Sequence, residues 1–223
     1  MKSLYSIYNN KIIKNKDLKV DVFNASYFYG INVFEVIFFK YIPEKKIFYG
    51  FRIEDHFLRL KKSAKRLEIK NELTYDQTKR NIFRLIKKNK IKNDFTLKIT
   101  IFLNGDGSWA GFGTKKNTIL FSLKKHSNYG INQIKRVGVS TIIKFNNSLY
   151  NSNNKCGANY LLSRYALIEA RQKKFQNIIF LDKIKNITET TNSNIFIIKK
   201  NIFYTPPISR YILDGITRKT IIS

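Results

Sequence analysis

Cysteine is almost absent from this chain: Cys156 is the only one in 223 residues. A single thiol excludes an intramolecular disulfide framework and a cluster of thiolate metal ligands. Histidine is scarce too, and neither His56 nor His126 has a partner at the spacing that metal ligands need. We therefore expect neither a disulfide-stabilised fold nor a metal centre.

Long apolar runs are missing as well. No stretch approaches the roughly 20 residues that a membrane-spanning helix needs. The first residues, MKSLYSIYNNKIIKNKD, contain no apolar segment of a secretory signal. The chain also lacks a Walker-type phosphate loop and a G-x-G-x-x-G turn between a strand and a helix. These absences predict a cytoplasmic protein without either of the two common nucleotide-binding motifs.

Acidic residues are few: 15 Asp and Glu stand against 42 Lys and Arg, which gives a formal net charge of +27. Such an excess is typical of proteins that bind nucleic acid or anionic membranes. Here the cations are spread through both halves of the chain and accompany many Ile, Asn and Tyr residues. Biased residue usage explains this mixture, so we expect no membrane or nucleic-acid partner. A basic nucleic-acid-binding protein remains the alternative, and it requires cations and aromatic residues gathered on one face.

Hydrophobic residues make up 43% of the chain, which is enough for a sizeable core. Runs rich in aromatic and β-branched residues predict strands at residues 4–8, 34–40, 45–51, 95–103, 118–123, 136–143, 177–182, 193–200 and 201–206. Apolar residues at three- and four-residue steps predict helices at 54–69, 75–90 and 158–174, and a further helix begins near Gly215. A polar stretch around Gly130 marks a domain boundary. The pattern predicts an α+β protein with a small N-terminal domain, 1–127, and a larger C-terminal domain, 128–223.

Three features of the C-terminal half could carry chemistry. Lys155 stands just before a predicted helix, where the partial positive charge of the helix start favours the neutral amine that forms a Schiff base. Glu189 is flanked by small hydroxyl residues in what we expect to be a turn between two apolar strands, and it could serve a cationic ring nitrogen. The sequence Gly215-Ile216-Thr217 resembles a turn that opens a helix, which suits a phosphate.

The order and spacing of these features resemble a known family, the fold-type IV pyridoxal-phosphate enzymes, or class IV aminotransferases. The resemblance runs from about Leu4 to the last residue. It is carried by YFYGINVFEVI, DHFLRLKKSAKRLEI, KCGANYLLSRYALIEA, IIFLDKIKNITETTNSNIF and YTPPISRYILDGITR. It implies a two-domain fold like that of D-amino-acid aminotransferase, a homodimer, and a pyridoxal 5'-phosphate site at the domain junction.

The resemblance also implies roles for single residues. Lys155 matches the lysine that forms the Schiff base with the cofactor and then moves the proton, and Tyr160 matches the tyrosine that hydrogen-bonds the cofactor's phenolic oxygen. Glu189 matches the carboxylate that faces the pyridine nitrogen. Keeping that nitrogen protonated makes the ring an electron sink.

Further matches concern the cofactor phosphate and the substrate. Arg59 matches an arginine that contacts the phosphate, and Ile216 with Thr217 matches the turn that holds the same group. Tyr29 and Phe34 match small-domain residues that line the substrate pocket.

Lys98 belongs to the same pocket, and there the chain departs from one branch of the family. Branched-chain aminotransferases tend to carry an arginine where Lys98 stands, whereas the lyase branch tends to carry a lysine. Lysine is a point charge and cannot grip a carboxylate bidentately as arginine can. Val36 falls where branched-chain members usually have glycine, whereas the rest of YGINVFEVI is closer to the transaminases.

On balance the resemblance implies transfer of an amino group from branched-chain L-amino acids to 2-oxoglutarate. D-amino-acid transamination and aminodeoxychorismate lysis remain alternatives within the family, and an inactive truncated relative remains a third. Family members continue beyond the Gly-Ile-Thr-Arg turn, so we expect an incomplete larger domain with an exposed apolar face near residues 213–223.

Overall fold

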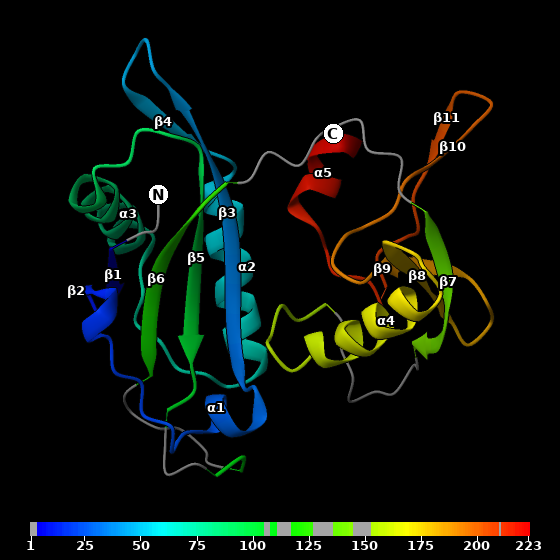
Figure 1. The fold of residues 1–223 in the computed structure, drawn as a ribbon, viewed down its shortest axis with the longest axis horizontal. Helices are drawn as coiled ribbons and strands as arrows, with labels where there is room; N and C mark the ends of the chain where they lie inside the picture. Colours follow the sequence, from blue (N-terminus) through cyan, green and yellow to red (C-terminus); the bar gives the residue numbers. More distant parts are fainter. Residues whose placement is uncertain (1–3, 105–107, 111–116, 127–135, 145–152, 210) are drawn as a thin grey trace. The chain divides into compact units, whose positions relative to one another are not determined.

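The computed structural model describes residues 4–104, 108–110, 117–126, 136–144, 153–209 and 211–223. The chain forms two compact units (Figure 1). The first contains residues Met1–Tyr129 together with Cys156–Ala158, and the second contains Gly130–Lys155 and Asn159–Ser223. The boundary predicted at residues 127 and 128 lies outside the described residues.

The first unit is built on a six-stranded antiparallel sheet with the strand order β2-β1-β6-β5-β3-β4. Its strands are β1 (Tyr5–Tyr8), β2 (Lys11–Lys14), β3 (Asn32–Ile42), β4 (Ile47–Gly50), β5 (Phe95–Phe102) and β6 (Thr118–Lys125). A 3-10 turn, η1 (Asn15–Asp17), and a short helix, α1 (Ala25–Tyr29), link β2 to β3.

One face of this sheet is covered by two amphipathic helices, α2 (Ile53–Arg66) and α3 (Tyr75–Asn89), which pack on β3 and β1 respectively (Figure 1). The core between them is formed by the alternate apolar residues of the strands and the inward stripes of the helices, such as Ile37, Leu60, Leu85 and Leu97. The helix α3 begins with a capping box, in which Thr74 and Gln77 exchange side-chain and backbone hydrogen bonds.

The second unit holds a three-stranded sheet, β7 (Val137–Lys144), β8 (Asn177–Asp182) and β9 (Ile187–Thr190). The strands β7 and β8 run parallel, and the helix α4 (Tyr160–Gln172) lies between them in the chain and packs on both. Ala166, Ala170, Ile178 and Phe180 form the small core under α4. A separate hairpin, β10 (Ile197–Lys199) and β11 (Ile202–Tyr204), precedes the last helix, α5 (Ile216–Ile222).

The predicted helices and strands are present, although many of their ends differ; β3, for example, is longer than predicted at both ends. Four short elements were not predicted: β2, η1, α1 and β9. The prediction that Glu189 lies in a turn is wrong, because this residue is part of β9 and pairs with β8 through its neighbours. The apolar surface expected near residues 213–223 is present only at the last turn of α5. Ile221 and Ile222 are more than half exposed, whereas Ile216 is buried.

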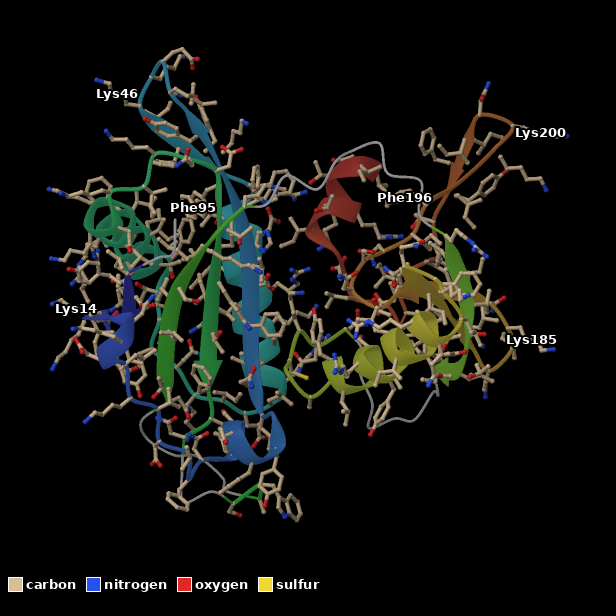
Figure 2. All side chains as sticks on the ribbon, viewed as in Figure 1. Lys14, Lys46, Phe95, Lys185, Phe196 and Lys200 are labelled. Atoms are coloured by element: carbon tan, nitrogen blue, oxygen red, sulfur yellow. The ribbon has the colours of Figure 1, made fainter. Side chains whose placement is uncertain are left out.

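Lysine occupies several backbone positions that usually favour glycine. Lys46, Lys90, Lys185 and Lys200 have a φ between +50° and +65°, in the left-handed region. Three of them, Lys46, Lys185 and Lys200, mark the tips of hairpin turns in both units (Figure 2). Part of the positive charge therefore lies at turns, because lysine occupies backbone positions there that favour glycine.

Replacing Lys90 with glycine should raise the free energy of unfolding by about 0.5–1 kcal/mol, because Lys90 is the left-handed residue that ends α3. Urea unfolding followed by circular dichroism measures the change. The matched control is Lys87→Gly, three residues earlier inside the helix, which should lower the same free energy by up to about 1 kcal/mol. Equal losses in both variants would contradict this account of Lys90.

Glu169 ties α4 to the edge strand of its unit. Its carboxylate accepts hydrogen bonds from Ser140 Oγ at 2.7 Å, from the backbone N–H of Thr141 at 2.9 Å and from Lys173 Nζ at 2.7 Å. Burial opposes ionisation of this carboxyl, but the hydrogen bonds from Lys173, Ser140 and Thr141 outweigh it and lower the pKa of Glu169 to about 2.

Because the folded pKa of Glu169 lies below the ordinary value of 4.5, its contribution to stability is fully present above pH 4.5 and is lost as the pH falls towards 2. Glu169→Gln should therefore lower the free energy of unfolding by about 1–2 kcal/mol at pH 7, and by progressively less below pH 4.5. Urea unfolding at a series of pH values measures this. Asp76→Asn, which breaks an exposed pair with Lys79, is the control and should have little effect at pH 7.

Candidate active site

Lys155 lies in the turn that leads into α4, whose first residue is Tyr160. The Nζ atom of Lys155 donates a hydrogen bond to the hydroxyl of Tyr160 at 3.1 Å. The side-chain amide of Asn159 donates to the carbonyl oxygen of Asn154 at 2.7 Å, which closes the turn around Lys155. The predicted amine and phenol are therefore neighbours in space.

The three residues after Lys155 belong to the first unit, where they are bound to the start of β3 and to Gly30 just before it. Cys156 forms an isolated bridge with Val33, and the N–H of Gly157 donates to the carbonyl of Asn32 at 3.0 Å. A Cβ atom at Gly157 would lie 2.8 Å from the Asn32 side chain, so glycine is required for this close approach. The main chain directly after Lys155 is thus held in place by backbone hydrogen bonds.

Glu189 is buried and its carboxylate is already bound by protein groups. Lys144, the last residue of β7, places Nζ 2.5 Å from Glu189 Oε1, and the N–H of Leu213 donates to Oε2 at 3.0 Å. Lys144 also donates to the carbonyl of Tyr211 at 2.9 Å. A buried carboxylate needs a cation and N–H donors around it, and Glu189 has both.

The segment before α5 is held by a hydrogen bond within the second unit. The side-chain amide of Asn194 donates to the carbonyl of Leu213 at 2.9 Å, and it packs directly against the Cα of Gly215. Ile216 is the first residue of α5 and is buried, whereas Thr217 follows it and is exposed. The backbone of the predicted phosphate turn is therefore anchored, with the threonine hydroxyl on the surface of this unit.

Arg59 lies on α2 and binds a carboxylate of its own unit. Its Nε and Nη2 atoms donate to the two oxygens of Glu35 at 2.6 and 2.7 Å, and His56 Nδ1 lies 2.7 Å from Oε2 of the same residue. Burial raises the pKa of the Glu35 carboxyl, but the hydrogen bonds from Arg59 and His56 outweigh burial, so the net pKa is lowered. The contact between Arg59 and a phosphate stays a prediction.

Two of the three predicted substrate residues are neighbours on the open face of the first sheet. Lys98 on β5 places Nζ 4.4 Å from the ring centroid of Phe34 on β3. Phe34 is buried and Lys98 is exposed. Tyr29, at the end of α1, is half exposed and packs edge-on against Phe28 at 6.1 Å.

Two residues in these arrangements, Glu35 and Lys144, were not identified in the sequence analysis. Glu35 could have been noticed, because it is an acidic residue inside the otherwise apolar strand NVFEVIFF of an acid-poor chain. Lys144 could not, since it is one of many lysines and its partner Glu189 lies 45 residues away in the sequence.

In the described part of the chain, no group of three or more His, Cys, Asp or Glu residues could hold a metal ion. None of the described helices is both long and apolar enough to span a bilayer.

Comparison with known proteins identifies the family of this chain. The family model described as amino-transferase class IV matches residues 32–223. The chain is 28% identical over 228 residues to the branched-chain-amino-acid aminotransferase of Escherichia coli K12, covering 99% of this chain and 72% of that protein. It is 30% identical over 217 residues to a putative branched-chain-amino-acid aminotransferase of Methanocaldococcus jannaschii, covering 96% and 72%.

A relative with another activity is also similar: the D-alanine aminotransferase of Bacillus licheniformis, 25% identical over 230 residues, with 97% of this chain and 73% of that protein covered. Among solved structures, the Escherichia coli branched-chain amino acid aminotransferase superposes with a TM-score of 0.91 at 27% identity, over 99% of this chain and 73% of that one. The fold-type IV architecture is thereby confirmed, over about three quarters of the length of these relatives. The chain belongs to the class IV aminotransferase family and is an aminotransferase.

Proposed function

We propose that the protein transfers the amino group of branched-chain L-amino acids to 2-oxoglutarate, with pyridoxal 5'-phosphate held by Lys155. The observation that carries this proposal is the pair formed by Lys155 Nζ and the Tyr160 hydroxyl at 3.1 Å, at the start of α4 in a class IV chain. The substrate class rests on the relatives from Escherichia coli and Methanocaldococcus jannaschii, whose names give branched-chain amino acids.

The residues present fit this cofactor chemically. The second unit offers a primary amine for an aldehyde, a phenol for a phenolic oxygen and an ion-paired carboxylate for a ring nitrogen, at Lys155, Tyr160 and Glu189. Ile216, Thr217 and Arg59 would bind the phosphate. When bound, pyridoxal phosphate supplies an aldehyde that captures the amino group and a ring that accepts electrons.

The protein groups would then act as follows. Lys155 Nζ would take up the proton from the substrate Cα as a general base and hold it as an ammonium. Tyr160, which accepts a hydrogen bond from that Nζ in this structure, orients the amine. Glu189 would hold the proton on the ring nitrogen, and Lys144 keeps this carboxylate in one orientation.

We infer further that the enzyme acts as a cytoplasmic homodimer. Support for a partner surface comes from α1 and the chain before it, where Phe23, Tyr27, Phe28 and Tyr29 are exposed aromatic residues packed edge-on against one another. Exposed aromatic clusters of this kind often mark interfaces.

D-amino-acid transamination is the second candidate, favoured by the similarity to the Bacillus licheniformis D-alanine aminotransferase. Elimination from aminodeoxychorismate is the third candidate, favoured by the lysine at position 98. All three candidates use the same cofactor groups. They differ in how the substrate carboxylates are bound, and therefore in the amino donor that the enzyme accepts.

Lys155→Ala should abolish the visible absorbance band that the wild-type protein develops with pyridoxal phosphate, because the amine that binds the aldehyde is gone. Borohydride should trap the cofactor on the peptide that contains Lys155, as read by mass spectrometry. Lys174→Ala, an exposed lysine of the same unit, is the control and should keep the band. A trapped cofactor on another lysine would contradict the proposal.

Lys98→Met should raise the KM for 2-oxoglutarate by about tenfold, because the cation beside Phe34 is the proposed partner of a substrate carboxylate. The KM for L-leucine should change less, since its side chain is apolar. Steady-state kinetics with L-leucine, L-valine and D-alanine as donors measures both effects and separates the candidates. Lys124→Met, on the neighbouring strand β6, is the control. Preference for D-alanine would overturn the proposed substrate.

A further inference from the structure

Lys144 is among the most buried charged residues in the described part of the chain. Only 4% of it is exposed, and a lysine is almost never buried to this extent unless it is paired. Its ammonium donates to Glu189 Oε1 at 2.5 Å and to the carbonyl of Tyr211 at 2.9 Å. It also lies 4.9 Å from the ring centroid of Phe180, a core residue of the same unit.

Glu189, the partner of Lys144, is also hydrogen-bonded to the segment 211–213. Glu189, 9% exposed, accepts a hydrogen bond from the N–H of Leu213 at 3.0 Å through its second oxygen. The ion pair therefore binds one carbonyl and one N–H of the segment 211–213. Ile212 between them is buried, and the chain continues directly into Gly215 and α5. Three segments that are distant in sequence, β7, β9 and 211–213, meet at this ion pair.

We propose that Lys144 is a positioning residue of the cofactor site. Its ammonium fixes the carboxylate of Glu189 and, through the segment 211–213, the turn that begins at Gly215. The inference rests on the proposed function, which assigns Glu189 to the ring nitrogen and Ile216 with Thr217 to the phosphate. Lys144 would act through these two groups, to which it is linked by the contacts with Glu189 and with the carbonyl of Tyr211.

Removing this ammonium changes both the charge and the geometry around Glu189. The elements packed against β9 carry two other acidic groups, and each has its own partners. Asp182 accepts from the N–H groups of Ile184 and Asn186, and Asp214 pairs with Lys219. Within the described residues, Lys144 is the cation in contact with Glu189. A buried carboxylate that loses its cation takes up a proton more readily as the pH falls, and a protonated Glu189 no longer favours a cationic ring.

The test uses 4'-deoxypyridoxine 5'-phosphate, which has the ring nitrogen and the phosphate but no aldehyde, so it cannot bond to Lys155. Its dissociation constant is measured by calorimetry for the wild type, Lys144→Met and Lys144→Arg. We expect Lys144→Met to bind about tenfold more weakly at pH 7.5, because one charged hydrogen-bond donor is lost. Lys144→Arg keeps the charge and should recover part of the affinity.

The matched control is Lys173→Met, which removes the lysine of another Lys–Glu pair in the same unit, Lys173 with Glu169 at 2.7 Å. This variant should bind the analogue as tightly as the wild type. The pH dependence separates positioning from folding: the loss in Lys144→Met should grow as the pH falls from about 8 to 6. A purely structural role would weaken binding equally at every pH and would not be corrected by arginine. Circular dichroism and thermal unfolding confirm that each variant is folded.

The outcomes are distinct. Wild-type binding with a pH-dependent loss in Lys144→Met supports the inference. Wild-type binding with affinity in Lys144→Met within twofold, or with a loss that does not vary with pH, overturns the inference and leaves the proposed function standing. If the wild type binds neither this analogue nor pyridoxal phosphate, the proposed function fails and the inference fails with it.

Discussion

The cost of burying a carboxylate shapes both units of this protein. An ionised carboxylate removed from water must find cations and N–H donors, or it takes up a proton. Glu35 meets this constraint with Arg59 and His56 between β3 and α2, and Glu189 meets it with Lys144 and the N–H of Leu213. In a chain with 15 acidic and 42 basic residues, two of the acids are placed where each organises a cluster of partners.

These two clusters bring together residues that are far apart in sequence, each cluster within its own unit. Glu35 fixes the guanidinium of Arg59 in the first unit. Glu189 links β9 to the end of β7 and to the segment before α5 in the second unit. Lys155 is positioned differently, by backbone hydrogen bonds of the three residues that follow it and by the turn that Asn159 closes. Hydrogen bonds to main-chain groups therefore hold the turn that carries the proposed catalytic amine.

Many of the lysines that make up the large positive charge lie away from these clusters. Lysines at hairpin tips and helix ends, such as Lys46, Lys90 and Lys200, adopt a left-handed backbone that glycine would adopt with less strain. They contribute to charge without contributing to the proposed chemistry. Lys144, Lys98 and Lys155 differ from them through their neighbours: a buried carboxylate, an aromatic ring and a phenol.

The strong elements and the family could be predicted from the sequence, because hydrophobic periodicity and short motifs are local properties. The strand at 95–102, the helices α2 and α3, and the order of Lys155, Tyr160, Glu189 and Gly215 could all be recognised in this way. The strand position of Glu189, its pairing with Lys144 and the pairing of Arg59 with Glu35 became visible in the folded chain alone. Pairings across 24 to 45 residues depend on how strands and helices pack. No local pattern distinguishes the buried Lys144 from the exposed lysines of the described residues, because burial is a property of the folded chain.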